Sequence, residues 1–157
     1  MFGFFKKKEE PFQVVACVDG KCIPISEVKD EVFSQKMMGD GFAIIPTGDM
    51  IVSPVSGNIE TIFPTKHALG IKTSNGVEII LHIGIDTVNL NGEGFTALVK
   101  ENTKVQAGQP LIQIDAKFIQ EKGYDLTTMT IFTAGYDKEI QLSCYNKEVK
   151  AKDILIS

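Results

Sequence analysis

The chain has 157 residues and a formal net charge of −4, with 43% hydrophobic and 23% charged residues. This length can bury a substantial core within one domain. The negative charge, without a basic stripe interleaved with aromatics, argues against general nucleic-acid binding. No apolar run approaches the roughly 20 residues of a membrane-spanning helix, and the order of residues at the start is not that of a secretion signal. These features predict a cytoplasmic protein.

Three cysteines, Cys17, Cys22 and Cys144, are odd in number and follow no metal-binding spacing. In a chain without an export signal, cysteines of this kind are typically reduced. We therefore expect three free and mostly buried thiols.

Residues 1–11 differ in composition from the rest of the chain, because Phe2, Phe4 and Phe5 are followed directly by three lysines and two glutamates. Aromatics beside a lysine cluster can enter an anionic membrane surface, which would give peripheral membrane contact through residues 1–8. The alternative is a frayed terminus without function. The sequence thus predicts a flexible arm over residues 1–11 and one domain over residues 12–157.

From residue 12 onward the pattern is that of β-structure. Short runs rich in Val, Ile, Thr and Phe are separated by Gly, Pro, Asn and Asp at close intervals. Helical character is limited to 116–122 and to a turn within 26–33. We expect an all-β, antiparallel β-sandwich or flattened barrel with one or two short helical turns. The expected strands are 12–18, 43–46, 51–55, 57–63, 68–73, 77–83, 111–114, 129–132 and 139–144.

A weak internal repeat relates residues 15–25 to residues 52–62. Valine, glycine and isoleucine recur at matching positions of the two segments, and residues 105–112 form a further strand-turn-strand of similar character. The repeat indicates a duplicated β motif, although turns in unrelated β-proteins also resemble one another.

Both histidines of the chain flank an Asn75–Gly76 pair, which is a strong hairpin signal between two β-like runs. A two-residue turn would place His67 opposite Gly84 and leave open space across from the ring. Because side chains alternate along a strand, His67 and His82 would then share one face with Thr65 and Asp86. The sequence therefore predicts a paired-histidine site beside a hydroxyl and a carboxylate.

Three chemistries fit two imidazoles on one face. A zinc site could take His67, His82 and Asp86 as ligands. Acid–base or hydrolytic catalysis could use a histidine oriented by Asp86, although no serine or cysteine stands in a nucleophile setting. Phosphotransfer could use one imidazole as nucleophile and the other to stabilise the phosphate, with Thr65 fixing the second ring. Phe63, Ile80 and Leu69 would add apolar docking surface.

Several motifs in order resemble one family. These are KMMGDGFAI at 36–44, VSPVSG at 52–57, FPTKHA at 63–68, VEIILHIGIDTV at 77–88 and LNGEGF at 90–95. Together they are similar to the glucose-type IIA component of the bacterial sugar phosphotransferase system, from about residue 12 to the C-terminus. The resemblance implies the β-sandwich called a duplicated hybrid motif.

The resemblance also implies roles for individual residues. His82 would carry the phosphoryl group on its Nε2 atom, His67 would support the phosphate, and Thr65 would orient His67. Asp40 and Asp86 would flank the site. Partner contact would involve these two aspartates together with Phe63, Ile80 and Phe42.

The implied function is that of a phosphocarrier, which accepts a phosphoryl group from phosphorylated HPr and passes it to a cysteine of a sugar-permease IIB domain. No cofactor is expected, apart from a zinc ion bridging His67 and His82 at a partner interface. One alternative is a regulatory protein that binds permeases or metabolic kinases according to its phosphorylation state. Another is a zinc hydrolase resembling the lysostaphin-type endopeptidases, which carry a His-x-His pair where this chain has His82-Ile-Gly84.

Overall fold

The computed structural model describes residues 11–157, so the predicted N-terminal arm, apart from Pro11, lies outside the described residues. In this part of the chain, no helix is both long enough and apolar enough to cross a membrane. The three cysteines are free thiols, of which Cys17 and Cys22 are buried and Cys144 is half-buried.

The described chain is built from short strands, and all pairings between them are antiparallel. The expected all-β, antiparallel fold class is therefore confirmed. The strands are β1 (Val14–Val15), β2 (Gly20–Pro24), β3 (Asp40–Pro46), β4 (Met50–Val52), β5 (Gly57–Ile62), β6 (Ala68–Lys72), β7 (Glu78–Ile83), β8 (Phe95–Ala97), β9 (Lys104–Val105), β10 (Pro110–Ile114), β11 (Thr128–Ala134), β12 (Glu148–Val149) and β13 (Ile154–Ile156).

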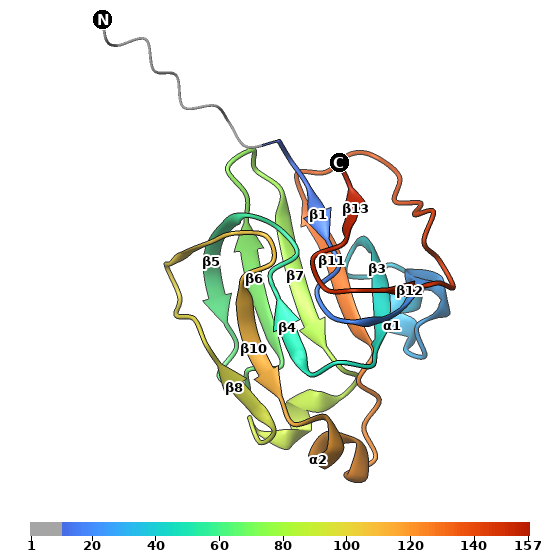
Figure 1. Ribbon diagram of the computed structural model, residues 1–157, viewed down its shortest axis with the longest axis vertical. Coiled ribbons are helices and arrows are strands. Elements are labelled where there is room, and N and C mark those ends of the chain that lie inside the picture. Colours follow the sequence, from blue (N-terminus) through green and yellow to red (C-terminus); the bar gives the residue numbers. More distant parts are fainter. Residues whose placement is uncertain (1–10) are drawn as a thin grey trace, which may run out of the picture.

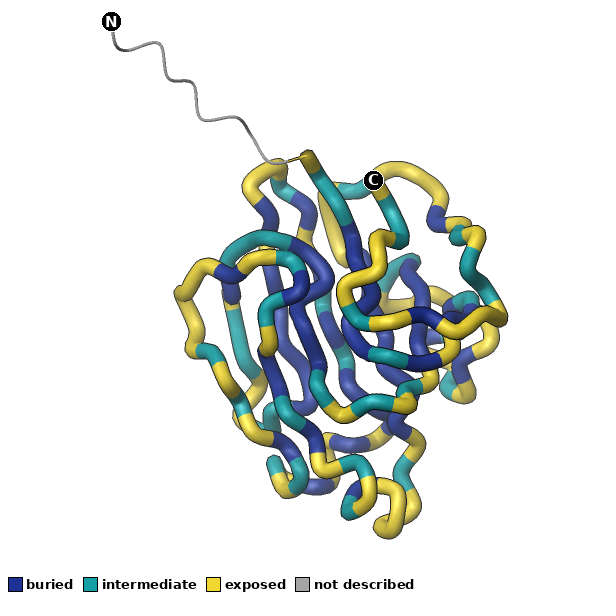
Figure 2. The backbone as a smooth tube through the Cα atoms, viewed as in Figure 1, coloured by how far each residue is buried: buried dark blue, intermediate teal, exposed yellow. Residues whose placement is uncertain are grey.

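Two layers of strands form a sandwich (Figure 1). The large layer is an eight-stranded sheet in the order β12-β2-β3-β11-β7-β6-β5-β9. The second layer consists of a three-stranded sheet, β4-β10-β8, and the β1-β13 pair. The main core lies between the layers, where the tube is mostly dark blue in Figure 2.

The predicted repeat is visible in the hydrogen bonding. The Val15 N–H donates to the Pro54 carbonyl at 2.8 Å, and the Val52 N–H donates to the Cys17 carbonyl at 2.7 Å. Because each of these segments makes the same bond to the other, the two repeats lie side by side as equivalent partners. The strand order of the large sheet reads equivalently from both ends, so β2 corresponds to β5, β3 to β6, and β11 to β7.

A second, smaller apolar cluster covers the outer face of the large sheet. A 3₁₀ turn, η1 (Ile25–Glu27), and a single-turn helix, α1 (Glu31–Ser34), pack over this face. The Asp30 carboxylate caps α1 by accepting a hydrogen bond from the Val32 N–H at 2.9 Å. The cluster consists of Ile23, Ile25, Val28, Phe33, Ala43, Ile85, Met129 and Ile131, with Ile80 packed against it.

The helical expectations agree with the structure. The predicted turn within 26–33 overlaps η1 and α1, and the helix predicted over 116–122 is α2 (Ala116–Glu121). One further 3₁₀ turn, η2 (Thr87–Leu90), follows β7.

The strand expected at 139–144 is wrong, because this segment is irregular and ends in a turn. Its backbone does not join a ladder at Ile140, whose N–H points instead to the Asp40 carboxylate at 3.4 Å. The pairing strand comes later, as β12, which aligns Glu148 with Lys21 of β2. Apolar residues in this segment pack against the main core from irregular backbone, a case that alternation alone cannot distinguish from a strand.

Phe42 was expected to contact partner proteins, and the structure corrects this expectation. Its side chain is 0% exposed and belongs to the main core between the layers. Alternation along β3 directs Phe42 and Ile44 into that core, whereas Ala43 faces the outer cluster. Phe42 therefore contributes to stability and is not available for docking.

We expect Phe42→Ala to lower the free energy of unfolding by roughly 3–5 kcal/mol, the usual cost of removing a buried aromatic ring. The matched control is Ile45→Ala on the same strand, because Ile45 is 43% exposed; its cost should be about 0.5 kcal/mol. Urea unfolding followed by circular dichroism measures both values. Equal stability of the two variants would contradict the placement of Phe42 in the core.

Candidate active site

The hairpin between β6 and β7 sets the position of the site, and its register differs by one residue from the prediction. His82 aligns with Ala68, and the Thr73 N–H donates to the Val77 carbonyl at 2.9 Å. The loop is therefore residues 74–76, one residue longer than a two-residue Asn-Gly turn. The Thr73 hydroxyl stabilises this loop by accepting a hydrogen bond from the Val77 N–H at 3.0 Å and by contacting Asn75.

The two histidines still meet, although not through strand alternation. His67 precedes the first residue of β6 and follows Lys66, whose φ of 58° lies in the left-handed region. This turn, closed by a 2.7 Å bond from the Lys66 N–H to the Phe63 carbonyl, directs the His67 ring toward His82. The ring centroids are 5.0 Å apart and the planes are nearly perpendicular, at 81°.

His82 is held in one tautomer by the backbone. Its Nδ1 atom lies 2.9 Å from the carbonyl oxygen of Gly84. Because a carbonyl oxygen only accepts, Nδ1 must carry the proton, and the lone pair of the neutral ring is on Nε2. The His82 residue is half-buried, so it keeps some exposure to solvent.

Glycine is needed at position 84 for this contact. The sequence had instead predicted that Gly84 leaves open space opposite His67. Its φ is +81°, and a Cβ atom there would lie 2.5 Å from Cγ2 of Thr87. The Thr87 hydroxyl also donates to the Ile83 carbonyl at 2.5 Å, which fixes the turn after β7. The turn therefore requires glycine, and it returns the Gly84 carbonyl to the His82 ring.

Thr65 is hydrogen-bonded to His67, so the structure brings these two candidate site residues together. The Thr65 hydroxyl lies 2.6 Å from Nδ1 of His67, and the His67 side chain is 4% exposed. Phe63 packs edge-on against the same ring, with centroids 5.5 Å apart, and remains 38% exposed itself. His67 is thus a buried ring with a fixed orientation beside an accessible aromatic.

Both imidazoles are neutral near pH 7. Burial lowers the pKa of His82 from 6.5 to about 4, and the neighbouring His67 adds to the decrease. The hydrogen bond to Gly84 and the charges of Asp30 and Asp86 act in the opposite direction without overcoming burial. Burial also lowers the pKa of His67. A neutral ring keeps its lone pair, as a nucleophile requires.

The predicted carboxylates take different places. Asp86 is exposed, follows β7 with a φ of 60°, and lies close enough for its charge to act on His82. Asp40, at the start of β3, instead accepts from the Gly41 N–H at 2.8 Å and pairs with Lys36 at 3.4 Å. Asp40 aligns with Phe132 of β11, two strands away from His82, so the structure does not join it to the histidine rings.

Two residues near His82 were missed by the sequence reasoning. The Phe33 ring lies 4.8 Å from the His82 ring, centroid to centroid, and Asp30 precedes it as the cap of α1. The available signal was the Asp30 N-cap before a short apolar run, which predicts a helical turn but not the sheet face it covers. Ile80 was placed correctly, half-buried on the same outer face as His82.

The zinc set of His67, His82 and Asp86 is not assembled. Within residues 11–157, no three His, Cys, Asp or Glu side chains are grouped so that they could hold a metal ion. Zinc bridging the two histidines at a partner interface would need ligands from the partner, and it stays a prediction.

Fold and site together define an antiparallel β-sandwich with a pair of neutral, oriented histidines. The family model described as phosphoenolpyruvate-dependent sugar phosphotransferase system, EIIA 1, matches residues 12–137. The chain belongs to this family, which confirms the resemblance drawn from its motifs, and it is therefore an EIIA component of the sugar phosphotransferase system.

Individual relatives agree with this assignment. The chain is 38% identical over 152 residues to the "PTS system glucose-specific EIIA component" of Staphylococcus aureus, covering 97% of this chain and 91% of the relative. It is 44% identical to the protein of the same description from Mycoplasma capricolum, covering 97% and 96%. The solved glucose permease IIA from Mycoplasma capricolum superposes with a TM-score of 0.84 at 43% identity, covering 94% of this chain and 96% of that one.

A longer relative contains the same unit. The chain is 46% identical over 138 residues to the "PTS system glucose-specific EIICBA component" of Staphylococcus saprophyticus. That match covers 88% of this chain but spans only 20% of the relative's length.

The lowered pKa of His82 predicts a pH dependence of stability. Since the folded value is about 4 and the unfolded value is near 6.5, the unfolded chain binds more protons between these values. The contribution of His82 to the free energy of unfolding should therefore be fully present above pH 6.5. It should fall as the pH decreases from 6.5 to 4 and stay level below 4. Two-dimensional NMR titration of the imidazole resonances should show His82 titrating near pH 4.

Urea unfolding at several pH values supplies the second measurement. His82→Gln should remove part of the decline between pH 6.5 and 4, because glutamine does not titrate. A His82 resonance titrating at 6.5 or above would show that the ring is not desolvated as described.

Proposed function

We propose that this protein is a glucose-type phosphocarrier, which accepts a phosphoryl group from phosphorylated HPr on Nε2 of His82 and transfers it to a cysteine of a IIB domain. The observation that carries this proposal is the hydrogen bond from Nδ1 of His82 to the Gly84 carbonyl, which leaves Nε2 as the nucleophilic atom. The site requires no cofactor for this chemistry.

In the first step, the Nε2 lone pair of His82 attacks the phosphorus atom, and the bond between phosphorus and the donor breaks. In the second step, the acceptor thiolate attacks the same phosphorus, and the phosphorus–Nε2 bond breaks, which returns His82 to its neutral form. The pKa of about 4 keeps the ring unprotonated before each cycle. While phosphorylated, the ring still has its Nδ1 proton bound to Gly84.

His67 would stabilise the phosphoryl group. If Nδ1 of His67 accepts from the Thr65 hydroxyl, Nε2 carries the proton and can donate to a phosphate oxygen beside His82. The 5.0 Å separation of the rings leaves them adjacent, so little movement is needed to reach a group on His82. Because the Nε2–H group of His67 is held in place before the reaction, it can stabilise the phosphoryl group during transfer without reorganisation.

Partner docking would use accessible apolar side chains around the two rings. Phe63, next to His67, is 38% exposed, and Val32, next to Phe33, is 41% exposed. Val88, in η2 after Asp86, is 47% exposed. Such side chains, together with the half-buried Ile80 and the carboxylates of Asp30 and Asp86, suit a partner with a basic rim around an apolar centre.

The glucose type and the IIB partner are supported by the relatives' descriptions. Three relatives and one solved structure are described as glucose-specific or glucose permease components, and in one of them the related unit is part of an EIICBA chain. This EIIA unit would meet its IIB partner at the inner side of the membrane, in the cytoplasm.

The proposal is tested by incubating the protein with phosphoenolpyruvate, enzyme I and HPr, followed by intact-mass analysis. Wild type should gain one acid-labile phosphate group, and His82→Ala should gain none. His67→Ala should still accept phosphate but pass it to a IIB domain more slowly. Absence of phosphate on wild type would overturn the carrier function, and phosphate on His82→Ala would show that another residue is the acceptor.

Thr65→Val should affect transfer more than acceptance. Valine keeps the size of threonine but cannot bond Nδ1 of His67, so the His67 ring loses its fixed tautomer. We expect the rate of transfer from phosphorylated His82 to a IIB domain to fall about tenfold, in line with the loss of one oriented hydrogen bond. Quenched-flow kinetics measures this rate. Thr65→Ser should retain most of it, because serine restores the hydroxyl; an equal loss in both variants would contradict the role of Thr65.

A further inference from the structure

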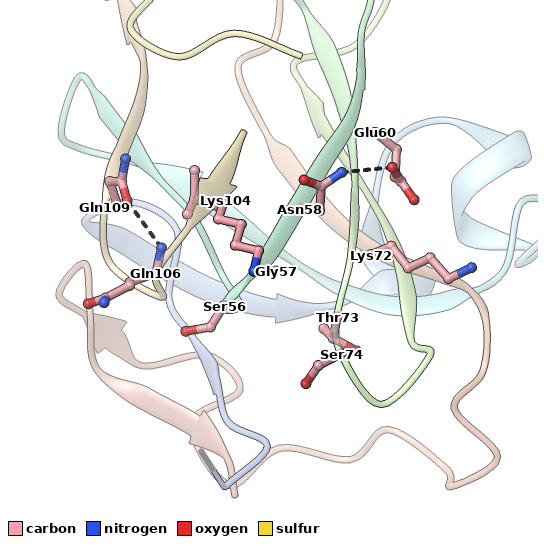
Figure 3. A pocket seen from close by; sticks show the side chains of 11 residues that line it. Ser56, Gly57, Asn58, Glu60, Lys72, Thr73, Ser74, Lys104, Gln106 and Gln109 are labelled. Carbon is pink, nitrogen blue, oxygen red and sulfur yellow. Dashed lines mark hydrogen bonds between the residues drawn. The ribbon is translucent and has the colours of Figure 1, made fainter. Parts of the chain in front are cut away.

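A second polar site lies at the other end of β6 from the histidines. A pocket of about 590 Å³ opens between β5, β6 and β9 and the turn that follows β9 (Figure 3). Its lining includes Lys72, the last residue of β6, whereas His67 precedes the first residue. Five residues of strand separate them, about 16 Å at 3.3 Å per residue. The pocket is therefore separate from the phosphotransfer site.

Two lysines flank an asparagine on one row of this pocket. Asn58 of β5 aligns with Lys72 of β6 on one side and with Lys104 of β9 on the other. Directly opposed residues project from the same face of a sheet, and two strand spacings set the lysine backbones about 10 Å apart. In Figure 3 the Lys104 ammonium lies near the middle of the group, beside Gly57, and the Lys72 ammonium lies toward the outside. Both side chains are exposed and long enough to swing onto one anion.

The other half of the fold shows that this row of lysines is not a requirement of the scaffold. The equivalent row on β2 places Lys21 between Ile45 and Glu148, so that the single lysine faces a carboxylate. In the half of the fold that contains the pocket, two lysines replace this pairing of a lysine with a carboxylate. Within residues 11–157 the only ion pair is Lys36–Asp40, which leaves both ammonium groups of the pocket available to a ligand.

The remaining lining groups suit hydroxyls. The Glu60 carboxylate accepts a hydrogen bond from the Asn58 amide at 2.9 Å and offsets one of the two lysine charges. A carboxylate has further acceptor capacity for ligand hydroxyl groups. The Ser74 hydroxyl also lines the pocket. The pocket thus combines an anion-binding side with acceptors for hydroxyl groups, at a volume typical of small-molecule sites.

We propose that this pocket binds the phosphate ester of a small hydroxylated molecule, such as a sugar phosphate. The phosphate lies between Lys72 and Lys104, where ammonium groups make charge-assisted hydrogen bonds to its oxygens. The hydroxyl groups face Glu60 and Ser74. This ligand site goes beyond the phosphocarrier function and does not use the histidines.

NMR titration of the full chain tests this site, with amide resonances as the readout and glucose 6-phosphate as the probe. The ligand should shift resonances of residues 56–60, 72–74 and 104–106, and unphosphorylated glucose should not. Lys72→Gln and Lys104→Gln should each weaken binding about tenfold, as expected for the loss of one charged hydrogen bond. Lys21→Gln, on the equivalent row of the other half, should leave the affinity unchanged.

Three outcomes would overturn the proposal. The first is that about 10 mM glucose 6-phosphate shifts no pocket resonance, because binding would then be too weak to matter. The second is that Lys21→Gln weakens binding as much as the two pocket substitutions do. The third is that the protein binds phosphatidylglycerol vesicles but not the soluble ester. The phosphotransfer site is read separately. His82→Ala should bind the ester as wild type does, and Lys104→Gln should still accept phosphate from HPr, so failure of one assignment leaves the other standing.

Discussion

The hydrogen bond between Nδ1 of His82 and the Gly84 carbonyl is the constraint on which the rest of the site depends. It decides which ring nitrogen has the lone pair, because a carbonyl oxygen can only accept. The Gly84 carbonyl can turn back to the ring only because the turn after β7 takes a positive φ at that residue. Burial then lowers the pKa of the same ring, so that backbone geometry and desolvation together produce one neutral tautomer.

The second imidazole follows the same logic with a different partner. Thr65 contacts His67 from the turn that precedes β6, and the His67 ring lies beside the His82 ring at the end of the hairpin. The Phe33 ring of α1 also packs against the His82 ring, with centroids 4.8 Å apart. The outer apolar cluster beneath α1 therefore does more than stabilise the sheet, because it supplies the low-polarity surroundings that keep the rings uncharged.

The sequence was sufficient for the fold class and the repeat, because these rest on alternation, turn residues and matching segments. It failed where a single residue in a loop decides the outcome. Thr73 stabilises a longer loop than Asn75–Gly76 predicts, and this shifts the hairpin register by one. The predicted meeting of the histidines survived only because Lys66, with a left-handed φ, takes His67 out of the strand pattern. Phe33 could not be foreseen, since sequence does not show which sheet face a short helix covers.

The duplication shows what the scaffold itself requires at the places where the histidines lie. β3 and β11 of one half correspond to β6 and β7 of the other, so Asp40, aligned with Phe132, takes the place that His67 has beside Ile83. By the same correspondence, Ile131 takes the place of His82, since each comes one residue before the aligned pair Phe132 and Ile83. Ile131 is an ordinary member of the outer apolar cluster.

An apolar β-branched residue thus satisfies the fold at this place, whereas an imidazole there costs stability whenever it must be protonated. Histidine in place of isoleucine at this position therefore adds no stability to the fold. The histidine in the second half is therefore explained by its chemistry, and the half without histidines serves as an internal reference for the scaffold alone.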